Sequence, residues 1–401
     1  MRKKLLSDAL PNVFQRSKAK RAEAIAAGRN IFNLTVGQPA GPAILEARIA
    51  AAQAVMSEKE SMHEYQDNTC LGVPDFARRF VQCHVVRDLK DYTPDDITYL
   101  PIPGIKPMLQ VLVESLGTWE RPGSLSRVYT MTDPGYPTPA YVCGAIKGIQ
   151  QVGLPLNPKK GFLFSPEDLI DISEGDMICL NFPENPTGII ARRDWLTNLC
   201  RFCSDRGVRL FNDGAYHILN NSPESVTLTD VALGFRDLNW IEAFSASKAG
   251  NFTGWRVGAM AGSPEFIADV TQIKGNLDSG FVAFAAAGVL EVFEKHRDRI
   301  DEVRQVYAER LELVMSVLKR QGMRLAVKPE AGFFLLFDAP TRAFGQDIAN
   351  GEEFNNLMTD KTSVCGIPFG KWIRYAVCAT DVGAQITEIE AGFAAAQVSY
   401  E

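Results

Sequence analysis

The stretch SASKAGNFTGWRVGAMAG, residues 245–262, places one lysine among hydroxyl groups and glycines. Lys248 is flanked by Ser245 and Ser247, and Arg256 follows eight positions later. The apolar runs WIEAFSASK and RVGAMAG overlap this stretch and are typical of buried strands. We therefore expect Lys248 at the end of a strand, in an open setting, and not on a solvated helix face.

Similar strand-like runs alternate with helix-like runs through the middle of the chain. The strand-like runs are residues 97–101, 126–137, 176–188, 208–216, 240–248 and 256–262. This alternation predicts an α/β fold with a mainly parallel sheet, because a parallel connection needs a crossover helix. The runs are apolar throughout, which fits a sheet covered by helices on both faces.

A smaller α+β domain is predicted from the two ends of the chain. Residues 282–321 carry no helix breaker and predict one long helix that leaves the large domain. Two strand-like runs, 331–338 and 371–378, follow it, and a closing helix comes last. We place the large domain at residues 34–290 and the small domain at residues 1–33 and 291–401.

Composition limits the function classes that fit. The chain has 401 residues, of which 46% are hydrophobic, and its net charge of −6 argues against a non-specific nucleic-acid surface. The basic amino terminus resembles the start of a signal peptide, but Asp8 and Pro11 interrupt the apolar part. No apolar run approaches the roughly 18 residues of a membrane span. We expect a cytoplasmic protein that contacts neither membrane nor nucleic acid.

Cysteines and histidines give no metal signature. Cys200 and Cys203 form a CxxC pair, which raises the possibility of metal or redox chemistry. The surrounding residues have helical periodicity and no second pair follows, so we interpret them as two half-buried helix cysteines. The four histidines lack metal-binding spacing. No metal site is expected.

Residues with functional chemistry recur where the predicted strands end. They are Gly104, Ile105, Lys106, Tyr136, Asn185, Asp213, Tyr216 and Lys248. Each has a structural explanation alone, since DPGYP and NPTG are good turns and GWRVG fits a hairpin. Ligands of open parallel sheets bind beyond the carboxyl ends of the strands, so the set predicts one binding site.

The same motifs are similar to those of a known family. YQDNTCLG, PGIK, DPGYP, NFPENPTG, NDGAY, SASK and GWRVG resemble the class I/II aminotransferases, which are fold-type I pyridoxal-phosphate enzymes. The resemblance runs from VGQP at residues 36–39 to IRYAVC at residues 373–378. The lysine segment most resembles the LL-diaminopimelate aminotransferase branch, a likeness that concerns the cofactor site.

The resemblance implies a role for each cofactor-binding residue. Lys248 would form the aldimine with pyridoxal 5'-phosphate and shuttle the proton at the substrate Cα. Asp213 would keep the pyridine nitrogen protonated, so that the ring accepts electrons. Tyr216 and Asn185 would hydrogen-bond the 3′ oxygen, and Tyr136 would stack on the ring. The phosphate would be held by the backbone of Gly104, Ile105 and Lys106 together with Ser245, Ser247 and Arg256.

Three further residues follow from the same resemblance. Arg374 would clamp the substrate α-carboxylate, although a strand arginine can also belong to a structural ion pair. Gly37 would line the substrate pocket. Tyr65 matches a tyrosine that reaches the phosphate from a second subunit, which implies a homodimer with shared sites.

Departures from the family pattern lie on the substrate side. Only three residues separate Gly370 from Arg374, where relatives carry a longer loop, and VGQPAGPA lacks a common acidic residue. We expect transfer of an amino group from an α-amino acid to a 2-oxo acid, with the amino donor open. The alternatives are another fold-type I chemistry, such as that of a β-lyase, oxidase or cyclase, and a non-catalytic ligand-binding protein.

Overall fold

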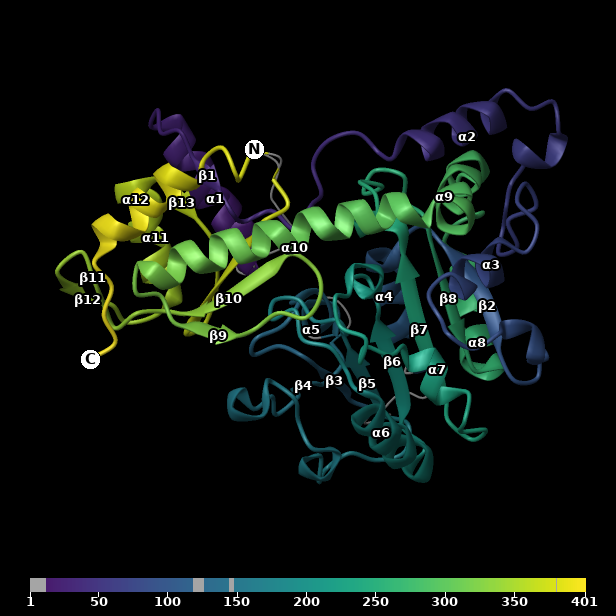
Figure 1. Ribbon diagram of the computed structural model, residues 1–401. Coiled ribbons are helices and arrows are strands. Elements are labelled where there is room, and N and C mark those ends of the chain that lie inside the picture. The colour runs from purple at the N-terminus through teal and green to yellow at the C-terminus, as the bar shows by residue number, and fades with distance from the viewer. Residues whose placement is uncertain (1–11, 118–125, 144–147, 380) are drawn as a thin grey trace, which may run out of the picture.

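The computed structural model describes residues 12–117, 126–143, 148–379 and 381–401. Its larger part is built on a seven-stranded sheet (Figure 1). In spatial order the strands are β2 (Thr98–Ile102), β8 (Gly258–Gly262), β7 (Trp240–Ser245), β6 (Arg209–Asp213), β5 (Met177–Leu180), β3 (Val128–Thr130) and β4 (Gln151–Gly153). Strand β8 is antiparallel to β2 and β7, and the remaining neighbours pair in parallel. The expected helix-covered, mainly parallel sheet is confirmed.

Successive side chains of the central strands serve two separate cores, because strand residues alternate between the faces of a sheet. On β6, Leu210 packs into one core and Phe211 into the other. The Phe211 face is covered by α4 (Ile105–Glu114) and α8 (Pro264–Lys274). The Leu210 face is covered by α3 (Phe76–Gln82), α6 (Arg193–Arg206), α7 (Leu228–Ala232) and α9 (Ala283–Lys295).

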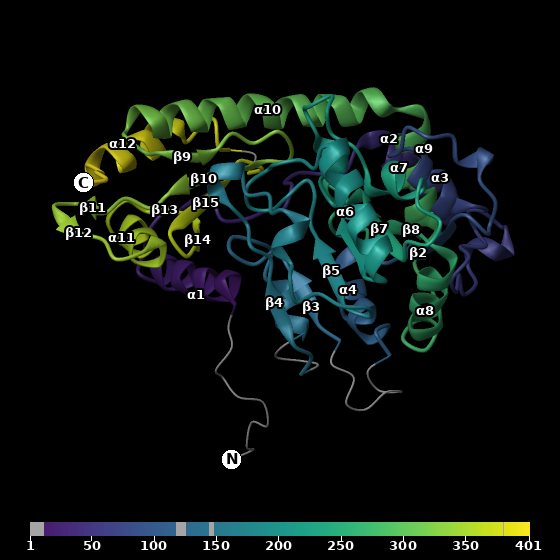
Figure 2. The ribbon, with the colours of Figure 1, turned by 90° about the horizontal axis from the view of Figure 1, so that it is seen from below.

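Helix α10 (Arg297–Arg320) runs from the large sheet to the smaller part of the molecule (Figures 1 and 2). The single helix predicted over residues 282–321 is therefore wrong, since α9 and α10 are separate helices. His296 separates them with φ −130° and ψ 46°. No glycine or proline marks this break, which arises because α9 packs against α2 (Leu45–Val55) whereas α10 extends toward the small sheet. The domain boundary predicted after residue 290 falls inside α9 and stays a prediction.

The smaller part contains a four-stranded antiparallel sheet. Its order is β14 (Ile367–Phe369), β15 (Trp372–Ala376), β10 (Phe334–Asp338) and β9 (Leu325–Val327). Around it lie α1 (Val13–Ala26), α11 (Gly351–Thr362), α12 (Ile386–Ala396) and the strand pairs β1 (Phe32–Asn33) with β13 (Val364–Cys365) and β11 (Arg342–Ala343) with β12 (Gln346–Asp347). Helix α5 (Thr138–Tyr141) belongs to the larger part, where it contacts α4 and β3. The pairing of β1 with β13 joins an amino-terminal segment to the carboxy-terminal part.

The cysteine pair singled out in the sequence lies on α6, with Cys200 and Cys203 both fully buried. All eight cysteines are free thiols. Within the described ranges, no helix is both long enough and apolar enough to cross a membrane.

Candidate active site

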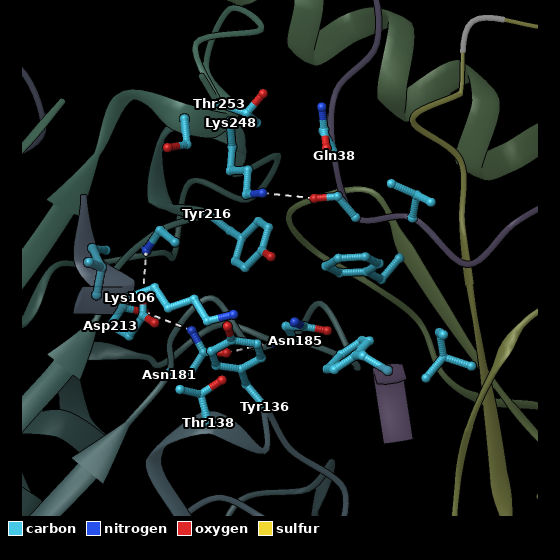
Figure 3. A pocket seen from close by; sticks show the side chains of 18 of the residues that line it. Gln38, Lys106, Tyr136, Thr138, Asn181, Asn185, Asp213, Tyr216, Lys248 and Thr253 are labelled. Atoms are coloured by element: carbon cyan, nitrogen blue, oxygen red, sulfur yellow. Dashed lines mark hydrogen bonds between the residues drawn. The ribbon is translucent and has the colours of Figure 1, made fainter. Parts of the chain in front are cut away.

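A cavity of about 650 Å³ lies where the carboxyl ends of the large-sheet strands face the smaller sheet (Figure 3). This is the edge at which ligands of open α/β sheets bind. Every predicted site residue except Gly104 and Tyr65 lines the cavity: Gly37, Ile105, Lys106, Tyr136, Asn185, Asp213, Tyr216, Ser245, Ser247, Lys248, Arg256 and Arg374. Residues from distant parts of the sequence therefore line one cavity.

Lys248 follows β7 in a short helical turn, and its amine points into the cavity. The Ser247 amide donates a hydrogen bond to the Ser245 hydroxyl oxygen over 3.1 Å and so stabilises the turn. Lys248 Nζ donates to the Gly37 carbonyl over 2.8 Å, the contact drawn in Figure 3. Burial lowers the pKa of this amine to about 8, because the charged form loses its hydration. An amine with this pKa can act as a base near neutral pH.

Asp213 ends the neighbouring strand β6, and its carboxylate also faces the cavity. Its Oδ1 accepts one hydrogen bond from the Ala215 amide over 3.2 Å. Burial raises the pKa of this carboxyl to about 6. No lysine or arginine of the described ranges forms a salt bridge with Asp213. The carboxylate therefore suits a cationic group on a ligand, as a protonated pyridine nitrogen would supply.

The opposite end of the cavity has the character of an anion site. Helix α4 begins beside it, and the first amides of a helix have no partner within the helix. Arg256 donates from Nη2 to the Pro103 carbonyl over 3.0 Å and from Nη1 to the Thr253 carbonyl over 3.1 Å. Gly104 does not line the cavity, but a Cβ at this position would collide with the Arg256 guanidinium. Its lack of a side chain lets the arginine lie against the helix start, an arrangement that fits a phosphate group.

Arg374 on β15 is 1% exposed and carries a charge that no carboxylate of the described ranges neutralises. Its Nη1 donates to Asn185 Oδ1 over 2.8 Å and its Nη2 to the Thr35 carbonyl over 2.7 Å. The guanidinium lies 4.2 Å from the ring centre of Phe334 and 5.0 Å from that of Phe14. Burial lowers its pKa to about 10, and Nε has no partner. Among the described residues Arg374 forms no structural ion pair of the kind considered from the sequence, and the arginine suits an incoming carboxylate.

Two tyrosines give the cavity aromatic walls (Figure 3). The Tyr216 ring packs edge-on against Phe333 and Phe334, with ring centres 5.7 Å and 5.5 Å away. Tyr136 lies on the other side of the site, 6.1 Å from the Phe14 ring centre. Burial raises the pKa of both phenols, so both stay protonated and can donate hydrogen bonds.

Tyr65 lies outside the cavity of its own chain and is 77% exposed. Its contact with the phosphate across a subunit interface stays a prediction.

Several cavity residues escaped the sequence interpretation. They are Asn12, Phe14, Gln15, Lys18, Arg21, Thr35, Val36, Gln38, Thr138, Asn181, Ala215, Thr253, Phe334 and Ile367. Asn181 joins two predicted residues, since its Nδ2 donates to the Asp213 carbonyl over 2.8 Å and its Oδ1 accepts from the Asn185 amide over 3.0 Å. The α1 residues carried one usable signal, because positions 14, 18 and 21 fall on one face of a helix.

The chain is similar to known proteins over most of its length. The family model described as aminotransferase class I and II matches residues 29–383. An LL-diaminopimelate aminotransferase of Methanocaldococcus jannaschii is 28% identical over 381 residues, covering 91% of this chain and 86% of that protein. One from Natranaerobius thermophilus is 29% identical over 353 residues, covering 86% of each.

The fold is also that of a solved structure. Aspartate aminotransferase from Thermus thermophilus with maleate superimposes with a TM-score of 0.80 at 20% identity, covering 98% of this chain and 99% of that one. At that identity the likeness concerns the fold. The family match, by contrast, spans nearly the whole chain, so this protein belongs to the class I and II aminotransferases, pyridoxal-phosphate enzymes that move amino groups between amino acids and 2-oxo acids.

Proposed function

We propose that Lys248, Asp213 and Arg374 are the three charged groups through which this aminotransferase acts on an α-amino acid and a 2-oxo acid. One observation carries the proposal. All three side chains are buried or nearly so, face the same cavity and form no salt bridge within the described ranges. Buried charges without partners are costly, so the set suits ligands that bring the opposite charges.

Pyridoxal phosphate supplies a conjugated ring that withdraws electrons from the substrate carbon attached to it. Lys248 Nζ would hold the aldehyde end of this cofactor, and Asp213 would hold the proton on its ring nitrogen. Tyr216 and Asn185 would hydrogen-bond the ring oxygen, and Tyr136 would pack on the ring face. Arg256 and the start of α4 would hold the phosphate, with Ser245 and Ser247 beside them.

Arg374 and Lys248 have different functions toward the substrate, since one binds it and the other transfers its proton. Arg374 binds the α-carboxylate through its planar fork of donors, which fixes the orientation of the substrate. Lys248 Nζ would take the proton from the substrate Cα and deliver it to the carbon that was the cofactor's aldehyde, so that the amino group stays with the cofactor. A pKa of about 8 serves both directions, because a base near ambient pH accepts and releases a proton with similar ease.

We further propose a cytoplasmic homodimer. Free thiols at all eight cysteines fit a reducing compartment. Tyr65 is exposed, as are the apolar residues Leu45, Ile49 and Leu71 in the segments before and after it. Such apolar exposure suits a surface that a second copy covers and from which Tyr65 enters the neighbouring site.

The first test concerns Lys248 and the reaction type. Borohydride reduction should attach the cofactor to Lys248 alone, as peptide mapping would detect, and Lys248→Ala should lose the attachment. With an amino donor and no oxo acid, each active site should release one equivalent of 2-oxo acid and then stop. Label on a different lysine would contradict the site, and continuous release of ammonia would favour β-elimination or oxidation over transamination.

Asp213→Asn should separate stability from activity. The pKa of the Asp213 carboxyl is raised to about 6, so its contribution to stability is present below its unfolded pKa and is lost as pH rises through 6. The cofactor-free variant should unfold like wild type at pH 4 and be more stable at pH 8 by about 3 kcal/mol. Turnover should fall by several orders of magnitude. A variant that is destabilised at pH 8, or that retains turnover, would contradict this role.

We expect Arg374 to contribute to substrate binding and not to the stability of the fold. Arg374→Met should leave the free energy of unfolding unchanged or raise it by about 1–4 kcal/mol, because an unpaired buried charge is removed. Arg374→Lys should keep the charge but weaken donor binding at least tenfold, since an ammonium cannot form the bidentate contact. Chemical denaturation and donor titrations measure the two effects. A loss of several kcal/mol in Arg374→Met would show a structural arginine instead.

The dimer proposal predicts complementation between two damaged chains. If Tyr65 acts across the interface, a heterodimer of Lys248→Ala and Tyr65→Ala chains contains one intact site. Refolding an equimolar mixture should then restore about a quarter of wild-type activity, above the mean of the two parent variants. Light scattering supplies the control for assembly. A monomer, or a mixture no more active than that mean, would contradict the proposal.

A further inference from the structure

Helix α1 presents a basic face to the cavity. Phe14, Lys18 and Arg21 line it and lie close to one line along the helix, because residues three and four apart are neighbours on a helix surface. Phe14 reaches deepest, since its ring lies beneath the Arg374 guanidinium at 5.0 Å. Lys18 and Arg21 therefore come one and two helical turns after Phe14, the residue whose ring contacts Arg374, the proposed binding group for the α-carboxylate.

The other basic residues of α1 are engaged elsewhere. Arg16 pairs with Glu352 over 3.1 Å and Lys20 with Asp360 over 2.7 Å, both on α11. In the described part of the chain, no carboxylate comes within salt-bridge distance of Lys18 or Arg21. The basic residues of α1 thus form two rows, one neutralised by α11 and one turned to the cavity.

Arg21 is held in place by neutral groups. Its Nη1 donates to Asn33 Oδ1 over 3.1 Å and to Thr35 Oγ1 over 2.6 Å. Thr35 also accepts, through its carbonyl, the bond from Arg374 Nη2 over 2.7 Å. Two guanidinium groups are therefore anchored on one residue, with Arg374 fully buried and Arg21 partly exposed. Because both groups are anchored on Thr35, a ligand that carries two anionic groups joined by a short chain can engage both.

The charges around the cavity favour a second anionic group on the substrate. The only acidic residue of the described ranges that lines the cavity is Asp213. The basic residues that line the cavity are Lys18, Arg21, Lys106, Lys248, Arg256 and Arg374. The proposed roles engage Lys248 and Arg256 with the cofactor and Arg374 with the α-carboxylate, and Lys106 lies in the first turn of α4 at the phosphate end. Lys18 and Arg21 have no role in that set.

We propose that Lys18 and Arg21 bind a second carboxylate on the substrate side chain, so that the preferred donors are acidic α-amino acids. This inference rests on the proposed function, since it takes the Arg374 clamp as given. The hydroxyl and amide groups that fix Arg21 leave its Nε and Nη2 without partners in the described ranges, available to a carboxylate. Lys18 adds a second, exposed cation one turn earlier on the same face.

The kinetic test compares donors of equal shape and different charge. In the wild-type holoenzyme, kcat/KM for L-glutamate or L-aspartate should exceed that for the matching amide, L-glutamine or L-asparagine, at least tenfold. Lys18→Ala and Arg21→Ala should each lower kcat/KM for the preferred acid 10- to 100-fold and change that for its amide less than threefold. Lys20→Ala, on the α11 side of the same helix, is the matched control and should change neither.

A binding measurement gives a readout that does not depend on turnover. Calorimetry should show that glutarate binds wild type at least tenfold more tightly than pentanoate, which has the same chain length and one carboxylate. Lys18→Ala and Arg21→Ala should remove this difference and leave pentanoate binding intact. Lys106→Ala, tested in parallel, should preserve it.

The outcomes separate this inference from the proposed function. Equal use of acid and amide, a loss shared by both in the α1 variants, or a loss confined to Lys106→Ala would overturn the assignment to α1 while leaving transamination intact. If no donor yields a 2-oxo acid and borohydride does not label Lys248, the proposed function itself fails.

Discussion

The parallel pairing of β6 with β7 is the constraint on which the cavity depends. Asp213 lies opposite Ala243 in the register of these strands, so the carboxylate and the turn carrying Lys248 leave the sheet at the same edge. Both strands are almost entirely buried, and a shift of one residue would turn every side chain to the opposite face. Hydrophobic packing on both sides of the sheet thus fixes the distance between two groups that must act together.

The ionisable groups around this edge of the sheet, Asp213, Lys248 and Arg374, reduce the stability of the folded protein when they are charged. Burial lowers the pKa of Lys248 and Arg374 and raises that of Asp213, which means that each charged form is disfavoured in the folded chain. Neutral partners, such as the Gly37 and Thr35 carbonyls, orient these groups without neutralising them. A site arranged in this way is completed electrostatically by its ligands, which accounts for the absence of internal salt bridges among these three residues.

Much of this arrangement could be predicted from the sequence. The apolar strand-like runs locate Asp213 and Lys248, because the hydrophobic pattern of a strand is a local property of the sequence. The helix start at Gly104 is likewise marked by a local signal. The contributions of Phe14, Lys18 and Arg21 could not be predicted, since they depend on how α1 packs against strands more than 300 residues away in the chain. The sequence does not predict the break at His296, because no helix-breaking residue lies there. The break is produced by the packing of α9 and α10 against different elements.

The central claim is that Lys248, Asp213 and Arg374 form one site complementary to a cofactor and a carboxylate. A crystal structure of the protein grown with pyridoxal phosphate and glutarate tests it most directly. We predict density continuous from Lys248 Nζ to the cofactor, the ring nitrogen within hydrogen-bond distance of Asp213, and one glutarate carboxylate on Arg374. Cofactor bound elsewhere, or Lys248 Nζ still bonded to the Gly37 carbonyl with cofactor present, would contradict the account.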